Sequence, residues 1–141
     1  MTDIFSHVMV GTDDVPRAIA FYDAVLAPLG LARYHTDPEG SDTDRAGACW
    51  TRTGTSWPQF WAQAPYDGRA ARAGNGVQVS FVARSPATVD AAYAAAMDAG
   101  GTDEGPPGLR PHYGPAYYGA YFRDPDGNKI HVVHTPDFDG M

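Results

Sequence analysis

An internal repeat constrains the fold of this chain more than any other feature of its sequence. A shift of 71 residues places His7 on Gln78 and Tyr22 on Tyr93, and the two segments align without a gap. Each segment begins with a short run of β-branched and apolar residues and then crosses a polar turn. Because one supersecondary unit cannot bury its apolar face alone, such a repeat predicts two packed copies of the same unit.

After the polar turn, each copy is predicted to contain an amphipathic helix. Asp14 and Ser85 stand where side-chain oxygens cap helix N-termini, and Pro86 occupies a first-turn position that needs no N–H donor. Gly100 and Gly101 predict a glycine C-cap for the second helix. Apolar residues recur at intervals of three and four in both copies: Ala18, Phe21, Tyr22, Val25, Leu26 and Leu29 in the first, and Val89, Ala92, Tyr93, Ala96 and Met97 in the second.

Three strand candidates follow each helix. They lie near Ala32–His35, Ala46–Arg52 and Gln59–Gln63 in the first copy and near Gly101–Asp103, Tyr117–Arg123 and Lys129–His134 in the second. The turn residues Asp124–Asn128 predict a tight hairpin between the last two strands. Residues 105–115 are rich in proline, and we expect a stiff connector there rather than a strand. The chain therefore predicts an α+β fold of two βαβββ modules, about residues 3–64 and 76–135, within a single domain spanning 1–141.

Composition excludes several classes of protein. Of 141 residues, 43% are hydrophobic and 19% are charged, which is typical of a globular domain and not of a disordered chain. No apolar run approaches the roughly 18–20 residues of a membrane span. The net charge of −7 disfavours a nucleic-acid partner. The single cysteine, Cys49, and the lack of a secretory signal predict a cytoplasmic location.

Several segments together resemble the vicinal oxygen chelate superfamily, which includes glyoxalase I, bleomycin- and fosfomycin-resistance proteins and extradiol dioxygenases. These segments are Ser6–Val10, Ala18–Tyr22, Leu29-Gly30 and Phe122–Ile130, and the resemblance extends from residue 4 to about 135. It implies curved, cup-like mixed sheets that enclose one small-molecule cavity. It also implies a homodimer, in some members with modules exchanged between chains.

The resemblance places possible metal ligands on the first and last strand of each module. Carried over to this chain they are His7, Gln78 and His131, with Phe60 nearest the fourth position and Gln59 or Trp61 there if the register differs by one residue. Imidazole ligands suit Fe²⁺, Ni²⁺, Co²⁺ or Zn²⁺. No carboxylate occurs at these positions, so the alternative is a metal-free pocket that the same polar side chains line.

Aromatic side chains indicate the rest of the candidate pocket. Alternate positions of a strand face opposite sides, so half of the aromatic residues are expected to line the concave face and suit a flat or apolar ligand. The proline-rich connector is either a plain link or a lid over the pocket mouth. The complete candidate ligand-binding set is His7, Trp61, Gln78, Arg110, His112, Tyr113, Tyr117, Tyr121 and His131.

Two functions fit this sequence. One is a binding protein of the bleomycin-resistance type, which sequesters a small organic ligand. The other is a metal-dependent lyase, isomerase or dioxygenase that acts on a small oxygenated substrate. In glyoxalase I a metal-bound glutamate serves as the base, and because this sequence offers none, we expect no glyoxalase I activity. The sequence identifies no catalytic residue.

Overall fold

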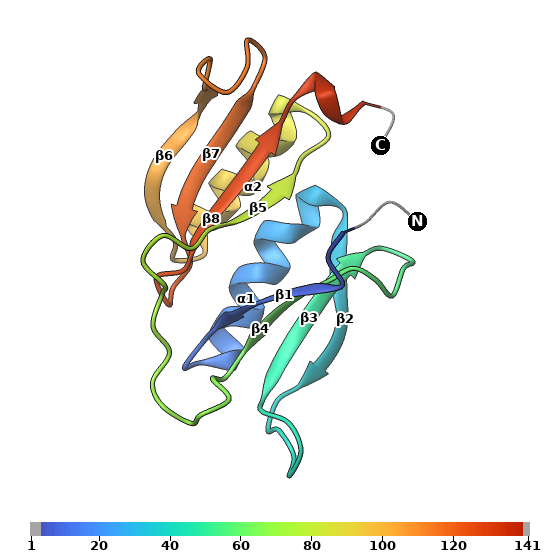
Figure 1. The fold of residues 1–141 in the computed structure, drawn as a ribbon, viewed down its shortest axis with the longest axis vertical. Coiled ribbons are helices and arrows are strands. Elements are labelled where there is room, and N and C mark those ends of the chain that lie inside the picture. Colours follow the sequence, from blue (N-terminus) through green and yellow to red (C-terminus); the bar gives the residue numbers. More distant parts are fainter. Residues whose placement is uncertain (1–3, 140–141) are drawn as a thin grey trace.

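The computed structural model describes residues 4–139, which form two βαβββ modules side by side (Figure 1). The first module contains β1 (His7–Gly11), α1 (Val15–Leu26), a 3₁₀ turn η1 (Ala27–Leu29), β2 (Leu31–Asp37), β3 (Gly47–Arg52) and β4 (Gln59–Gln63). The second contains β5 (Val79–Val82), α2 (Pro86–Asp98), β6 (Thr102–Leu109), β7 (Tyr118–Arg123) and β8 (Lys129–His134), followed by η2 (Pro136–Phe138). The α+β fold that the repeat predicted is confirmed.

Each module has one four-stranded sheet with the same topology. The strand orders are β1-β4-β3-β2 and β5-β8-β7-β6. The first strand of each module pairs in parallel with the last, and the remaining neighbours pair antiparallel. A parallel pair needs a long crossover connection, which the helix and the two intervening strands supply in both modules. As a result β1 and β5 are edge strands of their own sheets.

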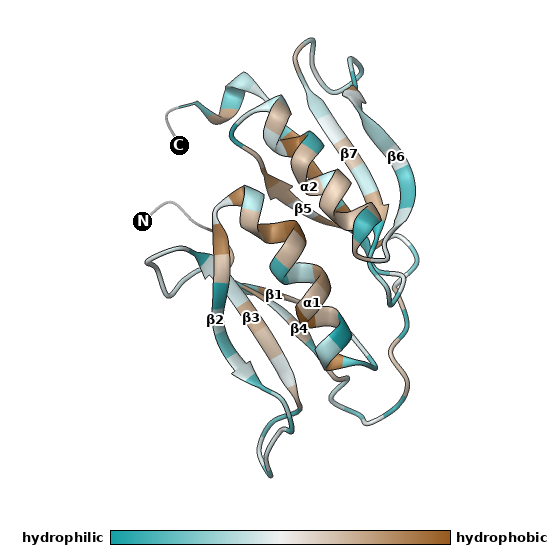
Figure 2. Cartoon of the chain, turned by 180° about the vertical axis from the view of Figure 1, so that it is seen from behind, coloured by the Kyte–Doolittle hydropathy of each residue, from teal (hydrophilic) through white to brown (hydrophobic). Residues whose placement is uncertain are grey.

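Both helices cover the same side of the two sheets, as Figures 1 and 2 show from opposite directions. Asp14 caps α1 by accepting a hydrogen bond from the Arg17 backbone N–H at 3.0 Å, and Ser85 caps α2 in the same way. Gly100, with φ at 98°, follows α2 in the left-handed conformation that glycine adopts easily. The helices turn an apolar stripe onto the sheets, where Trp50 and Phe122 are fully buried. No helix among residues 4–139 has both the length and the hydropathy to cross a membrane.

The proline-rich segment was predicted wrongly in part. Strand β6 continues through Pro106 and Pro107 to Leu109, where a connector was expected. It is an edge strand, and its register with β7 skips from Gly105 to Gly108, so the missing proline N–H groups remove no regular ladder bond. The connector is confined to the residues between β6 and β7.

The turn at Asp124–Asn128 joins β7 to β8, as predicted, and also ties the two modules together. The buried Asp124 carboxylate accepts a hydrogen bond from the Tyr22 hydroxyl of α1 at 2.6 Å. The Asn128 side-chain amide donates to the Gly11 carbonyl of the first module at 2.9 Å. Asp126 forms an ion pair with Arg17 at 2.9 Å. Three residues of one turn therefore hold α1 and the end of β1.

Apolar contacts complete this junction. Phe60 of β4 and Phe81 of β5 meet edge to face, with ring centroids 5.0 Å apart. Phe60 also packs against Tyr22 at 4.9 Å. Burial, followed by the nearby Asp124 carboxylate, raises the pKa of Tyr22 well above its ordinary value, so its hydroxyl remains a donor.

Replacing Tyr22 by Phe is expected to lower the free energy of unfolding by about 1.5–3 kcal/mol, because it removes a buried hydrogen bond to a charged group. Tyr118→Phe is a matched control, since the Tyr118 hydroxyl donates to exposed Asp90 at the same 2.6 Å. We expect this control to lose no more than about 0.5 kcal/mol. Urea denaturation of both variants checks the difference, and equal losses would contradict a role for burial.

Candidate functional site

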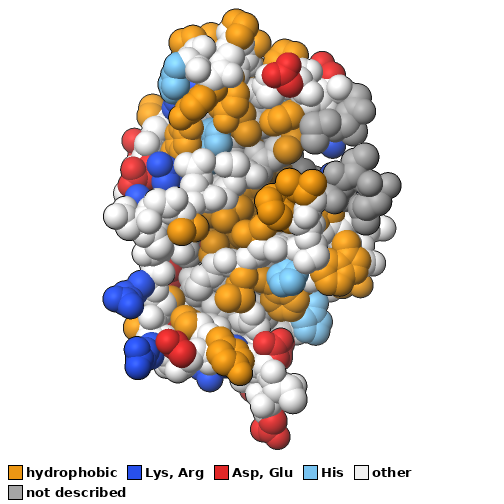
Figure 3. Space-filling view, in the orientation of Figure 1, with side chains coloured by type: hydrophobic (Ala, Val, Ile, Leu, Met, Phe, Trp, Pro, Cys, Tyr) orange, Lys and Arg blue, Asp and Glu red, His pale blue; other side chains and the backbone are white. Residues whose placement is uncertain are grey.

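The sheets leave one face uncovered, on the side away from the helices. Val10, Ile130 and Val132 belong to the core under the helices. Because successive strand residues point to opposite faces, His7 and His131 project toward the uncovered side. Figure 3 shows this side, with apolar side chains gathered in its middle, between the modules, and most charged side chains at its margins.

His131 is a polar residue of β8, an inner strand of the second sheet, and only 1% of its surface is exposed. Its Nδ1 lies 2.8 Å from the Ala120 carbonyl oxygen, which can only accept, so Nδ1 carries the proton. Its Nε2 lies 2.8 Å from the Tyr117 hydroxyl and therefore accepts that hydrogen bond. Both ring nitrogens are thus engaged within the protein.

The His131 ring is also held by stacking. Tyr121 lies parallel to it, with centroids 4.0 Å apart and an interplanar angle of 8°. Gly119 provides the room, because a Cβ there would lie 2.6 Å from His131 Cε1. Burial lowers the pKa of His131, and the positive charges of Arg110 and Lys129 lower it further against an opposing contribution from the Ala120 hydrogen bond. The imidazole is neutral at pH 7.

The segment between β6 and β7 lies beside this histidine. The Arg110 guanidinium lies over the Tyr121 ring at 5.7 Å. Tyr113 packs against Tyr117 at 5.2 Å, and His112 packs against Tyr113 at 4.1 Å. The structure therefore brings together six of the predicted site residues, all from the second module. The lid hypothesis for this segment stays a prediction.

The predicted residues of the first module form a separate cluster. The ring of His7 lies 6.4 Å from that of Trp57. The Trp61 indole N–H donates to Gln59 Oε1 at 2.8 Å. Phe60, which the predicted register put nearest the fourth ligand position, is buried in the core. The register therefore differs by one residue from the predicted one, and Gln59 and Trp61 face the uncovered side. The pairing of β1 with β4 mirrors that of β5 with β8, and this register places Trp61 where His131 stands in the second module.

The donor set at these four positions does not fit a divalent metal. His131 has no free ring nitrogen, and the indole of Trp61 is a donor only. His7 shares Nδ1 with the Ser6 hydroxyl at 2.8 Å, and the Gln78 amide N–H donates to Ser80 at 3.0 Å. Metal sites need three or four good ligands. Within residues 4–139 no group of three or more His, Cys, Asp or Glu side chains is placed to hold an ion.

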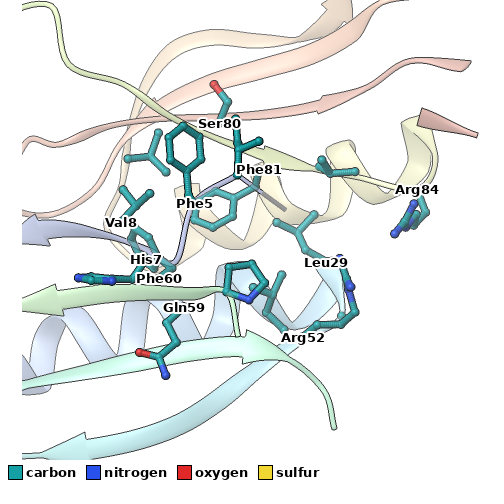
Figure 4. Close-up of a pocket in the computed structure, with 16 residues that line it drawn as sticks. Phe5, His7, Val8, Leu29, Arg52, Gln59, Phe60, Ser80, Phe81 and Arg84 are labelled. Atoms are coloured by element: carbon teal, nitrogen blue, oxygen red, sulfur yellow. The ribbon is translucent and has the colours of Figure 1, made fainter. Parts of the chain in front are cut away.

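A pocket of about 580 Å³ opens where the edges of β1 and β5 approach each other, and we call it the seam pocket (Figure 4). Its polar lining includes His7 and Gln59 of the first module and Ser80 of the second. Arg52 and Arg84 lie together on one side of it (Figure 4). Its apolar lining comes from both modules: Ile4, Phe5, Val8, Leu29, Leu31, Pro58, Phe60, Val79, Phe81 and Val82.

Of the predicted site residues, only His7 lines the seam pocket. The two arginines could not be predicted from the sequence, because no local motif distinguishes them. Arg52 ends β3 and Arg84 follows β5, so only the packing of one module on the other brings them to the same pocket. Gln59 had been considered as an alternative ligand and lies on the uncovered face next to Trp61.

Comparison with known proteins identifies the family. The model of the Glyoxalase/Bleomycin resistance protein/Dioxygenase superfamily matches residues 4–132. A solved structure, a glyoxalase/bleomycin resistance protein from Albidiferax ferrireducens T118, is 40% identical, covers 95% of this chain and 100% of its own, and has a TM-score of 0.76. The chain belongs to the glyoxalase/bleomycin resistance protein/dioxygenase superfamily.

More distant structures share the fold alone. A glyoxylase/bleomycin resistance protein/dioxygenase domain from Frankia sp. EAN1pec is 16% identical with a TM-score of 0.70, covering 95% of this chain and 98% of its own. A lactoylglutathione lyase from Agrobacterium tumefaciens is 21% identical with a TM-score of 0.63, covering 100% and 98%. Comparison with curated proteins gave no match.

The lowered pKa of His131 predicts a dependence of stability on pH. An unfolded imidazole binds a proton near pH 6.5, and the folded protein binds it only at lower pH. The stability that neutral His131 contributes is therefore present above about pH 6.5 and is lost as the pH falls below it. The difference in melting temperature between the parent and His131→Gln should shrink from pH 7.5 to pH 5. His112→Gln controls for loss of an exposed imidazole, and a constant difference for His131→Gln would contradict the prediction.

Proposed function

We propose that this protein binds a small organic molecule in the seam pocket and holds it there without metal-dependent glyoxalase chemistry. The observation that carries the proposal is the seam pocket itself. It has the volume of a small-molecule site, an apolar lining and a few polar groups at its edge, which is the usual composition of such sites. The bleomycin-resistance branch of the superfamily is the nearest functional analogue.

The polar groups of the uncovered face and of the seam pocket support binding rather than proton abstraction. His131 is neutral, but its Nε2 lone pair already accepts from Tyr117, so it is not available as a base. Burial raises the pKa of Tyr117, whose hydroxyl therefore remains protonated and continues to donate. His7 is exposed at the edge of the seam pocket and can offer Nε2 to a ligand hydroxyl. The exposed ring of Trp57, 6.4 Å from that of His7, can cover a flat ligand that extends out of the pocket.

Binding of N-phenyl-1-naphthylamine, a neutral apolar fluorescent probe, tests the proposal. We expect saturable binding at one site per chain, with enhanced fluorescence. Ser80→Trp places an indole in the seam pocket and should weaken this binding about tenfold or more, equal to a loss of at least about 1.4 kcal/mol. Thr102→Trp adds the same side chain at an exposed strand position outside the pocket and should leave binding within about twofold.

Two results would contradict the proposed function. One is the absence of saturable probe binding to the parent protein. The other is formation of lactoylglutathione from the glutathione hemithioacetal, at a rate that depends on added Ni²⁺ or Zn²⁺ and disappears in His7→Ala. Elemental analysis of protein purified without a chelator or a histidine tag measures directly whether a divalent metal accompanies the chain.

We further propose that the protein is a cytoplasmic homodimer, by analogy with members of the superfamily that pair. Light scattering should then give about twice the chain mass of 15.1 kDa. A mass near 15.1 kDa across the micromolar range would contradict the dimer.

A further inference from the structure

We propose that the seam pocket selects an apolar monocarboxylate, whose carboxylate lies against Arg52 and Arg84. This inference rests on the proposed function and adds the chemical class of the ligand. It is carried by the distribution of charge around the seam pocket, which differs from that of the whole molecule.

The apolar part of the ligand is indicated by the lining of the pocket. Phe5, Phe60 and Phe81 project into it from different strands and from the segment before β1 (Figure 4). Leu29 continues the apolar surface toward the arginines (Figure 4), and Val82 also lines the pocket. Burying apolar ligand surface against such walls contributes roughly 25 cal/mol per Å² before the costs of association are subtracted. A strongly hydrated ligand such as a free sugar phosphate would leave this surface unused.

The acidic end of the ligand is indicated by the two arginines. Among residues 4–139 no Asp or Glu lines the seam pocket, although the chain as a whole has a net charge of −7. The ion pairs of residues 4–139 use Arg17, Arg33 and Arg123, so neither pocket arginine has a carboxylate partner in this part of the chain. The pocket is therefore a local concentration of positive charge on an acidic protein.

The chemistry of the guanidinium group favours a carboxylate. Its planar donors match the two oxygens of a carboxylate, and both arginines are exposed, so their donors are open to a ligand. In Figure 4 both guanidinium groups lie on the same side, beyond the apolar walls. A ligand with its anionic group at Arg52 and Arg84 thus extends its apolar body toward the three phenylalanines, while the Ser80 hydroxyl can donate to a second polar substituent.

Displacement of bound N-phenyl-1-naphthylamine by two matched competitors tests this inference. The competitors are 1-naphthaleneacetate and 2-(1-naphthyl)ethanol, which share the aromatic frame and differ in the acidic group. With the parent protein we expect the acetate to displace the probe at a concentration at least about tenfold lower than the alcohol. In Arg52→Gln/Arg84→Gln the acetate should lose about tenfold or more, and the alcohol should change by less than about twofold.

A second double variant controls for the overall charge. Arg69→Gln/Arg72→Gln removes the same two charges from exposed positions outside the seam pocket and should leave both competitors unchanged. Equal displacement by the acetate and the alcohol in the parent, or an equal loss in both double variants, would overturn the inference while leaving the proposed function intact. A parent protein that does not bind the probe at all would overturn both. Unchanged melting temperatures establish that the variants are folded.

Discussion

The hydrogen bond from Tyr22 to Asp124 determines how the two halves of this molecule are arranged. The carboxylate of Asp124 is buried, and it accepts from the backbone and side chain of Asn128 as well as from Tyr22. The Asn128 bonds lie within the turn itself, so Tyr22 is the donor that helix α1 supplies, and without it the buried carboxylate would lose one of its hydrogen bonds. The hairpin of the second module is in this way fixed to the first module.

The candidate site follows from this junction. No backbone ladder joins β1 to β5 within the described chain, and the space between these two edge strands is closed by the contact of Phe60 with Phe81. At the end of the same boundary the seam pocket opens, with one arginine from each module on its side. The pocket is therefore a property of the paired modules and of neither module alone.

A histidine at position 131 changes what this site can do, compared with the glutamate common at this place in the superfamily. A glutamate would offer a charged oxygen to a metal or a proton. His131 is neutral, stacked on Tyr121 and engaged at both nitrogens by Ala120 and Tyr117. Together with Trp61 at the corresponding place in the first module, it puts an aromatic, hydrogen-bonded side chain on the uncovered face of each sheet.

The sequence by itself determined the repeat, both helices with their caps at Asp14 and Ser85, and the hairpin at Asp124–Asn128, because each depends on interactions between residues close in the chain.

Tertiary structure alone decided the rest. Whether Phe60 or Trp61 faces the open side depends on the pairing of β4 with β1, about fifty residues away, and a slip of one residue reverses every side chain. The prolines of β6 are tolerated because that strand is at an edge, which no local pattern reveals. The meeting of Arg52 and Arg84 at one pocket required the two modules to pack, since nothing in the local sequence of either arginine encodes the other.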